Sequence, residues 1–400
     1  MMAMGPLRSS ADPVQTTALK IGVSLALTGP DARYGLPMLR GVELAVEETN
    51  RSGGAGGHRL ETVVLDSAGP GEEGITRWRG MNNYERLIAD PTVVAVVGPQ
   101  TSGEARAVAP LLSRASLVTI TPSATTFDIT DPSLKERFRP GGQAVFFRTV
   151  GTDLAQGDAM ADFAHERLGI HRIVLIDDGT DFGVRMMLAF ARRAHALDMT
   201  ILAREKVPWT DGDYRRQLHE ASALNPEGLY FSGSYLVGVK LARQVAEVLP
   251  WVHHLATENL NDRAFPLQAG PGAEGWYVPS VAPDVGASPV AADWAERFRR
   301  RFGEAPSGYS LTAYTAATVI ASAIGRVVRS GRPVTRATVR QAVGATRLPA
   351  TLQGQVSFDA NGDLEHPVVS IYQVRSGSWQ YVRTTTVEGA PRDPKLLARP

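Results

Sequence analysis

The 400-residue sequence contains no cysteine. This absence excludes disulfide bonds, thiolate nucleophiles, iron–sulfur clusters and Cys-ligated zinc, so the folded state must be stabilised by packing. A large net charge is also missing, because 42 Lys and Arg stand against 41 Asp and Glu and leave a formal net charge of +1. Such a chain has no strong overall field to attract nucleic acid or an anionic membrane, and we therefore expect no nucleic-acid partner.

The common catalytic and cofactor motifs are missing as well. The chain has no G-x-G-x-x-G that follows a strand, and it has no G-x-x-x-x-G-K, G-x-S-x-G or H-E-x-x-H pattern. His253 and His254 are adjacent, and neighbouring side chains on a strand or loop point apart rather than toward one metal. We expect no cofactor, no bound metal and no catalytic residue. A hydrolase that uses Asp and His groups in a cleft is the enzymatic alternative, for which no nucleophile with a base is visible.

Long apolar runs are absent too. The first twenty residues hold no apolar run of signal-peptide length, and no later stretch reaches the ~18 apolar residues that a membrane span needs. We expect a soluble chain, with residues 1–18 as a disordered leader or cloning remnant and residues 386–400 as a C-terminal tail. A periplasmic location would then require a signal segment that is not present here, and a cytoplasmic location is the alternative.

Hydrophobic residues make up 43% of the chain, which suffices for two cores, since single cores stop growing near ~250–300 residues. Short apolar runs that end at turn residues alternate with helical patterns, and this alternation predicts parallel, doubly wound sheets. The pattern occurs in two series, which predicts an α/β protein with two such lobes. Strands are predicted at residues 19–27, 59–66, 93–98 and 118–121 in the first series, and at 172–177, 200–207 and 228–232 in the second.

The order of elements changes from Ser288 onward. Helical patterns at residues 289–302, 310–329 and 335–346 follow one another without strands, and strand-like segments close the chain. This order indicates that the chain returns to the first lobe and then crosses once more. We predict the following division: residues 19–150 and 273–351 in lobe 1, and residues 151–272 and 352–385 in lobe 2.

Candidate binding residues follow the predicted strands, because ligands of open parallel sheets lie at the carboxyl ends of the strands. Ser102 begins the helix after the strand that ends at Gly98, so its hydroxyl and the free backbone N–H groups could hold a carboxylate. The alternative is that Ser102 only caps its helix. Thr125, in the polar turn after residues 118–121, could offer a hydroxyl and an amide to the same anion, and the alternative is an ordinary Ser/Thr turn.

The second series offers two residues at equivalent places. Tyr235 lies beyond the strand at 228–232, and Glu258 lies at the end of the next strand. A carboxylate in a closing cleft is the natural partner for a ligand ammonium, because charge-assisted hydrogen bonds contribute ~1.5–3 kcal/mol each. The alternative is that Glu258 caps a short helix that begins near Asn261.

Several segments, in their order and spacing, are similar to those of a known family. They include VVGPQTSG, TPSAT, FRTVGTDLAQG, YFSGSY, GAEGWYV and GDLEHP. From about Lys20 to Trp379 the chain resembles the type I periplasmic ligand-binding proteins of branched-chain amino-acid ABC transporters, the leucine/isoleucine/valine-binding group. The resemblance implies a Venus-flytrap fold whose two lobes are joined by a three-segment hinge, with crossings near residues 150–153, 270–275 and 351–354.

The resemblance also implies roles for individual residues. Ser102 and Thr125, with the backbone of Gln100 and Ser123, would hold the carboxylate and amino group of the ligand on lobe 1. On lobe 2, Tyr235 and Glu258 would meet the ammonium. Tyr34 and Phe182 fall where relatives place aromatic residues that contact the ligand side chain.

The chain departs from the family at two places. Phe182 replaces a more usual Tyr, so one polar contact is lost and an apolar ligand is favoured. Gly69 and Thr101 stand where some relatives carry a disulfide.

Together these implications describe a non-enzymatic, monomeric receptor. It would capture a small amino acid, aliphatic or mostly apolar, and deliver it to the membrane permease of an ABC transporter. The alternative is a cytosolic sensor of amides or amino acids that is built on the same fold and regulates gene expression.

Overall fold

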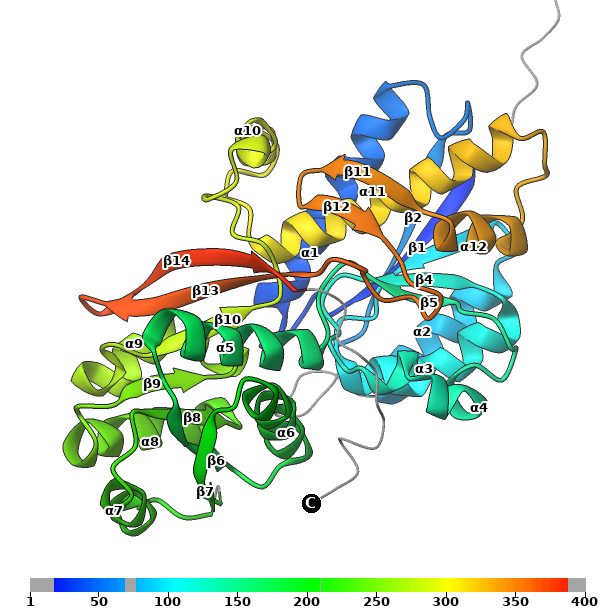
Figure 1. Cartoon of the computed structure of the whole chain (residues 1–400). Coiled ribbons are helices and arrows are strands. Elements are labelled where there is room, and N and C mark those ends of the chain that lie inside the picture. Colours follow the sequence, from blue (N-terminus) through cyan, green and yellow to red (C-terminus); the bar gives the residue numbers. More distant parts are fainter. Residues whose placement is uncertain (1–17, 69–76, 209, 388–400) are drawn as a thin grey trace, which may run out of the picture.

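The computed structural model describes residues 18–68, 77–208 and 210–387. Two sheets organise them into two lobes that lie side by side (Figure 1). The first sheet is five-stranded and parallel, in the order β2-β1-β3-β4-β5. Its strands are β1 (Leu19–Leu25), β2 (Leu60–Asp66), β3 (Val93–Val97), β4 (Val118–Thr121) and β5 (Phe146–Arg148).

Helices cover both faces of the first sheet, which explains why β3, with the sequence VVAVV, is buried along its whole length. Ile21 and Val23 of β1 pack into a core with three helices: α1 (Ala32–Arg51), α11 (Gly308–Arg329) and α12 (Arg336–Gly344). On the other face, Val93 and Val96 pack against α2 (Arg77–Ala89) and α3 (Ser102–Ala115). The helix α4 (Lys135–Phe138) and α10 (Ala292–Phe302) complete this lobe.

The second sheet has seven strands in the order β14-β13-β10-β9-β8-β6-β7. Five are parallel: β6 (Arg172–Asp177), β7 (Thr200–Lys206), β8 (Gly228–Ser232), β9 (His253–Ala256) and β10 (Tyr277–Ser280). Two antiparallel strands, β13 (Val368–Arg375) and β14 (Ser378–Thr386), extend its edge.

Alternate residues of β6 enter different cores. Ile173 and Leu175 pack with α5 (Asp153–Leu168) and α6 (Asp181–Ala196). Val174 and Ile176 pack with α7 (Arg215–Ala223), α8 (Tyr235–Val248) and α9 (Ala264–Ala269) on the opposite face. The predicted α/β fold of two doubly wound parallel sheets is therefore confirmed.

Two predicted lobe boundaries are wrong. The boundary at residue 273 falls too early, because β10 pairs with β9 and β13 in the second sheet. The glycines near residues 270–275 form a short 3-10 turn before β10 rather than a crossing. The chain therefore leaves the second lobe only after Ser280.

The boundary at residues 351–354 is the turn of a hairpin between β11 (Arg347–Thr351) and β12 (Gly354–Ser357). Beyond this hairpin, Phe358 and Leu364 still belong to the core of the first lobe. Asp363 also pairs there with Arg148, at 2.7 Å between Oδ1 and Nε. The last crossing therefore lies between Leu364 and β13.

One described helix, α11, is long and apolar enough to cross a membrane by length and composition. In the most apolar window of α11, 67% of the residues are buried inside the protein. The helix packs along α1 in the core of the first lobe, as expected for a core helix.

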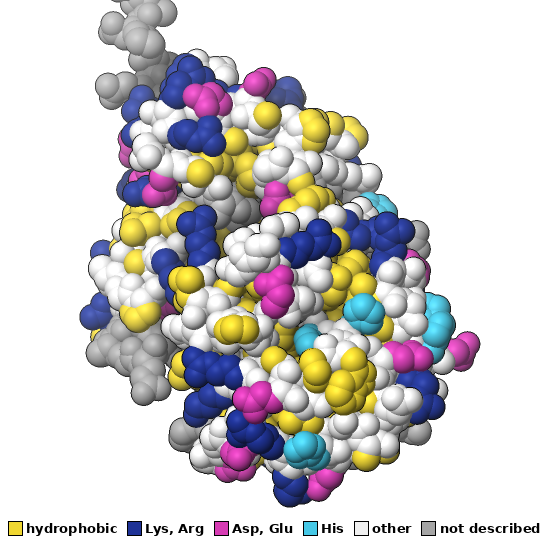
Figure 2. Space-filling model, turned by 90° about the vertical axis from the view of Figure 1, so that its left-hand side faces the viewer, with side chains coloured by type: hydrophobic (Ala, Val, Ile, Leu, Met, Phe, Trp, Pro, Cys, Tyr) yellow, Lys and Arg dark blue, Asp and Glu magenta, His cyan; other side chains and the backbone are white. Residues whose placement is uncertain are grey.

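The described surface mixes charges of both signs. Figure 2 shows Lys and Arg side chains scattered over one face of the molecule, with Asp and Glu side chains between them. This distribution on the face shown matches the net charge of +1.

Candidate functional site

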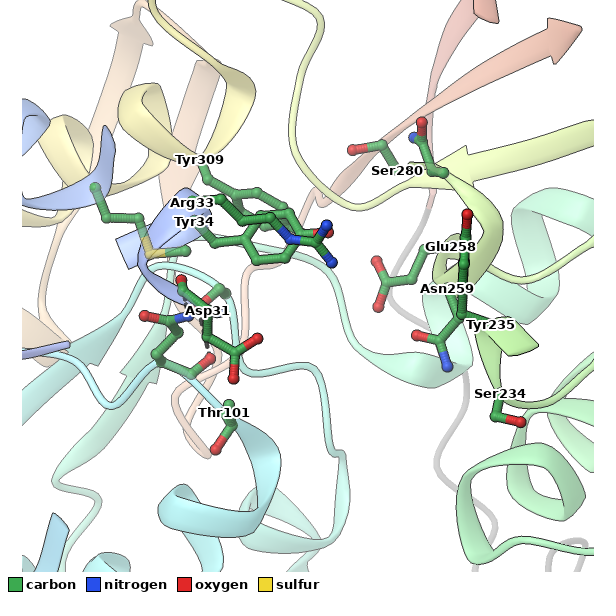
Figure 3. Close-up of a pocket in the computed structure, with 14 residues that line it drawn as sticks. Asp31, Arg33, Tyr34, Thr101, Ser234, Tyr235, Glu258, Asn259, Ser280 and Tyr309 are labelled. Carbon is green, nitrogen blue, oxygen red and sulfur yellow. Dashed lines mark hydrogen bonds between the residues drawn. The ribbon is translucent and has the colours of Figure 1, made fainter. Parts of the chain in front are cut away.

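A cleft of about 440 Å³ lies between the lobes, at the carboxyl ends of strands from both sheets. The first lobe lines it with side chains from α1 and its entry, from the loops after β3 and β4, and from the start of α11: Asp31, Arg33, Tyr34, Met38, Gln100, Thr101, Ser123 and Tyr309. The second lobe lines it with side chains that follow β8, β9 and β10: Ser234, Tyr235, Glu258, Asn259, Asn261 and Ser280. Figure 3 shows the two groups facing each other.

The loops of the first lobe are fastened together by neutral hydrogen bonds. The side-chain oxygen of Gln100 accepts a hydrogen bond from the backbone N–H of Ala26 at 3.0 Å, and its amide nitrogen donates to the carbonyl of Asp31 at 3.4 Å. Ser123 Oγ donates to the carbonyl of Gln100 at 2.7 Å. These bonds hold the loops after β1, β3 and β4 in one arrangement before any ligand arrives.

Of the eight predicted binding residues, five line the cleft: Tyr34, Gln100, Ser123, Tyr235 and Glu258. Ser102 and Thr125 lie on the same loops but do not line it. The Oγ of Ser102 accepts a hydrogen bond from the backbone N–H of Thr126 at 3.3 Å. The N-cap of α3 is Thr101, whose hydroxyl accepts from Glu104 N, so the alternative that Ser102 caps its helix is wrong.

Thr125 is buried beside the start of α5. Its carbonyl accepts a hydrogen bond from the backbone N–H of Asp153 at 3.0 Å, and its side chain hydrogen-bonds the Asp153 carboxyl group. Phe182 lies in the first turn of α6, outside the residues that line the cleft. The ligand contacts that the resemblance assigns to Ser102, Thr125 and Phe182 therefore stay predictions.

Arg33 and the Tyr34 hydroxyl of the first lobe contact Asp262 of the second lobe at one side of the cleft. The rings of Tyr34 and Tyr309 meet edge to face, with their centres 6.4 Å apart. Arg33 lies over the Tyr34 ring, and its Nη1 is 2.9 Å from Oδ2 of Asp262 in the second lobe. The Tyr34 hydroxyl donates to the same oxygen at 3.4 Å.

Glu258 enters the cleft from the end of β9. Its side chain points across the gap toward Tyr34 and Tyr309 (Figure 3). Its backbone N–H donates to Oε1 of Gln156 at 3.2 Å, while its carboxyl oxygen Oε2 is buried without a hydrogen-bond partner among the described residues. Burial, followed by the charge of Asp153, raises the pKa of Glu258 to about 7.

Tyr235 stands at the start of α8, on the same side as Glu258. Its hydroxyl donates to Oε1 of Gln268 at 3.2 Å. The preceding residue, Ser234, donates its backbone N–H to Oδ2 of Asp178 at 2.7 Å. The carboxylate of Asp178 thereby fixes the entry to α8 and the position of Tyr235.

Sequence reasoning missed several lining residues. Asn259 and Asn261 lie within three residues of Glu258 and could have been found by the same strand-end rule. Tyr309 could not be found in this way. It lies in the first turn of α11, and no local pattern indicates that this helix starts at the cleft. Among the described residues, no group of three His, Asp or Glu side chains is placed to hold a metal ion.

Comparisons with known proteins give one consistent result. Residues 18–378 match the model of a family described as periplasmic binding protein. A Leu/Ile/Val-binding protein homolog of Brucella melitensis is 27% identical over 359 residues, which covers 90% of this chain and 92% of that protein.

Solved structures with the same fold include two amino-acid complexes. One is the branched-chain amino acid transporter substrate binding protein LivJ from Streptococcus pneumoniae with isoleucine, with a TM-score of 0.72, 23% identity and coverage of 93% of this chain and 100% of that one. The other is an ABC transporter substrate-binding protein from Desulfitobacterium hafniense with Leu, with a TM-score of 0.75, 23% identity and coverage of 91% and 100%.

Proposed function

The chain belongs to the periplasmic binding protein family, and from this premise we propose that it captures an α-amino acid between its lobes and delivers it to the permease of an ABC transporter. The observation that carries the proposal is the composition of the two cleft walls. Neutral hydroxyl and amide groups of the first lobe face a carboxyl group of the second, Glu258, whose Oε2 is buried without a partner among the described residues. This pairing fits a zwitterion, with its acid end on one lobe and its ammonium on the other.

The ligand side chain in this proposal is aliphatic or mostly apolar. Tyr34, Tyr309 and Met38 give the first lobe an apolar surface beside the polar loops. The relatives' names and complexes with leucine and isoleucine support the same class of ligand. We place Ser102 and Thr125 in the proposed carboxylate site because they lie on the two loops that line it and Ser102 hydrogen-bonds the neighbouring loop at Thr126. In this proposal Phe182 contacts the ligand side chain once the lobes close.

Binding selects the closed arrangement, because both lobes can contact the ligand only when they meet. Closure also changes the outer surface of the protein, which is how a permease distinguishes the loaded receptor. We propose that the protein acts outside the cytoplasm, as a monomer and without catalysis.

A thermal-shift screen tests the proposal. The full chain is heated with each of the twenty amino acids, with simple amides and with aromatic acids. A ligand at a hundredfold excess over its dissociation constant stabilises the protein by about 2.7 kcal/mol, so L-leucine, L-isoleucine or L-valine should raise Tm by several degrees. The absence of a shift with every amino acid, or turnover of a bound compound, would overturn it.

A further inference from the structure

A single buried arginine lies beneath the loop that follows β4. This loop, residues 122–127, lies between β4 and the next helical turn, and we call it the β4 loop. Arg148, the last residue of β5, is fully buried. Its Nη1 donates to the carbonyl oxygens of Ala124 and Thr126, each at 3.0 Å. One guanidinium nitrogen therefore holds two carbonyl groups of the β4 loop.

The two carbonyl groups flank Thr125 and follow Ser123. Ser123 lines the cleft, and Thr125 belongs with it to the proposed carboxylate site. Residues 124–126 lie outside helices and strands, so regular secondary structure gives their carbonyl oxygens no partner and they need one elsewhere. The planar guanidinium fixes its N–H donors relative to one another, and it therefore fixes the distance between the two carbonyl groups as well.

The other two nitrogens of Arg148 point to an acidic side chain and a hydroxyl group. Nε is 2.7 Å from Oδ1 of Asp363, and Nη2 donates to Thr130 Oγ1 at 3.0 Å. Thr130 Oγ1 in turn donates to Oδ2 of Asp363 at 3.0 Å. The guanidinium is therefore held by a carboxylate on one side while it holds the β4 loop on the other.

A tight turn places Asp363 beside β5. The backbone N–H groups of residues 361–363 donate to Oδ1 of Asp359 at 2.8, 2.9 and 3.0 Å. Gly362 has a φ of 103°, and a Cβ atom there would lie 2.0 Å from the carbonyl oxygen of Phe146. The turn approaches β5 this closely only because residue 362 is glycine, and this approach brings the Asp363 carboxylate to Arg148.

A second arginine contacts the β4 loop in a different way. Arg106 Nη2 donates to Thr126 Oγ1, and its Nε is 2.6 Å from Oδ2 of Asp128. The side chain of Arg106 is 23% exposed, whereas that of Arg148 is 0% exposed. Arg106 therefore holds side chains, while Arg148 holds the backbone of the loop.

We propose that Arg148 is a positioning residue of the ligand site. Its guanidinium keeps the β4 loop in the shape that receives the ligand carboxylate, and Asp363 keeps the guanidinium in place. The inference rests on the proposed function and deepens it, because it makes carboxylate recognition depend on a side chain outside the lining of the cleft. A loop that is already ordered loses less conformational entropy when the ligand binds, so the ligand binds more tightly.

Calorimetry of the full chain at pH 7 with L-leucine and L-leucinamide, by direct titration or by competition, tests this role. L-leucinamide keeps the ammonium and the side chain but has a neutral amide in place of the carboxylate. Arg148→Lys keeps a positive charge beside Asp363 and loses the planar fork. We expect Arg148→Lys to bind L-leucine about tenfold more weakly and L-leucinamide about as tightly as wild type, so the preference for L-leucine falls about tenfold.

The matched control is Arg336→Lys in the same lobe. Arg336 also holds backbone carbonyl groups, with Nε 3.0 Å from the oxygen of Val93 and Nη2 2.9 Å from that of Ile88. Val93 begins β3, at the edge of the sheet opposite the cleft, so Arg336→Lys should bind both compounds as wild type does. The same preference for L-leucine in wild type and Arg148→Lys would overturn the inference, and so would an equal loss of affinity in Arg148→Lys and Arg336→Lys.

A second variant, Asp363→Asn, applies the same test even if Arg148→Lys does not fold. Asparagine has nearly the same shape and still offers an oxygen to Arg148 Nε, so only the charge is lost. We expect Asp363→Asn to bind L-leucine about two- to fivefold more weakly, with no loss for L-leucinamide. Wild-type affinity for both compounds in Asp363→Asn would overturn the inference. Failure of the wild type to bind any amino acid would instead overturn the proposed function.

Discussion

The first lobe meets the cleft mainly with neutral groups that are already hydrogen-bonded to one another, whereas the second meets it with a carboxyl group that has an oxygen unpaired within the described part of the chain. In the first lobe, Ser123 and Gln100 tie adjacent loops together at 2.7 Å and 3.0 Å. In the second, Oε2 of Glu258 is buried without a hydrogen-bond partner among the described residues, and burial raises the pKa of this carboxyl group to about 7. The comparison teaches that one lobe supplies shape and preorganised hydrogen bonds, while the other supplies the charge that makes closure depend on the ligand.

Removing the charge of the second lobe should have the largest effect. Glu258→Ala leaves the ligand ammonium buried without a counter-charge, which costs about 2–5 kcal/mol of binding free energy. Isothermal calorimetry with L-leucine at pH 8 measures this loss. Unchanged affinity in Glu258→Ala would show that the second lobe does not bind the head group.

A buried carboxyl group in the first lobe sharpens the comparison. Glu104 is 1% exposed, accepts a hydrogen bond from Ser24 Oγ at 3.2 Å and does not line the cleft. Burial raises its pKa to about 8. Its stabilising contribution is therefore complete below its unfolded-state pKa near 4.5 and is lost as the pH rises through about 8.

Glu104→Gln should remove this dependence. Between pH 6 and pH 9 the wild type should lose on the order of 2 kcal/mol of unfolding free energy through Glu104, and the variant should lose less. Urea unfolding of the unliganded proteins at both pH values gives the comparison. Saturation with L-leucine should leave the Glu104 contribution in place, because it lies outside the cleft; identical pH profiles for the two proteins would contradict this assignment.

Loosening the neutral wall should have a smaller effect than removing the charge. Ser123→Ala removes the bond from Ser123 Oγ to the Gln100 carbonyl, and one neutral hydrogen bond contributes about 0.5–1.5 kcal/mol. We expect L-leucine to bind about 2- to 10-fold more weakly by calorimetry. A loss of affinity as large as that of Glu258→Ala would contradict the claim that the second lobe contributes more to ligand binding than the first.

The contact between the lobes at the edge of the cleft should matter least. Asp262→Asn weakens the ion pair with Arg33, whose side chain is 60% exposed, and exposed pairs contribute about 0.2–1 kcal/mol. We expect L-leucine to bind up to about fivefold more weakly, with a faster release in stopped-flow fluorescence. The control is Asp213→Asn, which loses an exposed pair with Arg215 inside the second lobe and should bind L-leucine as wild type does.

The fold class was predicted correctly because buried parallel strands read as short apolar runs with turn residues at their ends. The family was predicted correctly from the resemblance of several segments in their order and spacing. The lobe boundaries failed where glycines marked turns within a lobe, as at Gly275 before β10 and at Gly354 in the β11–β12 hairpin. Glycine signals an unusual backbone conformation without saying which sheet follows.

Parts of the candidate site were predictable for the same reason. Tyr235 and Glu258 follow strand ends, and parallel strands bring their carboxyl ends to one edge. Gln100 and Ser123 were predicted through the resemblance to the family. The alternative that Ser102 caps its helix was wrong by one residue, because Thr101 and Ser102 both carry a hydroxyl and the sequence does not show which of them caps the helix. The position of Tyr309 depends on contacts between distant segments, which a local pattern does not contain.

The most direct test compares L-leucine with 4-methylpentanoate, which has the same carbon chain and carboxylate but no amine. Calorimetry at pH 8 on the wild type and on Glu258→Gln separates recognition of the ammonium group from recognition of the carboxylate and the carbon chain. The wild type should prefer L-leucine by at least about tenfold, as one charge-assisted hydrogen bond supplies, and Glu258→Gln should lose most of that preference. Equal affinity of the wild type for the two compounds would contradict the claim that the second lobe recognises the ligand by its charge.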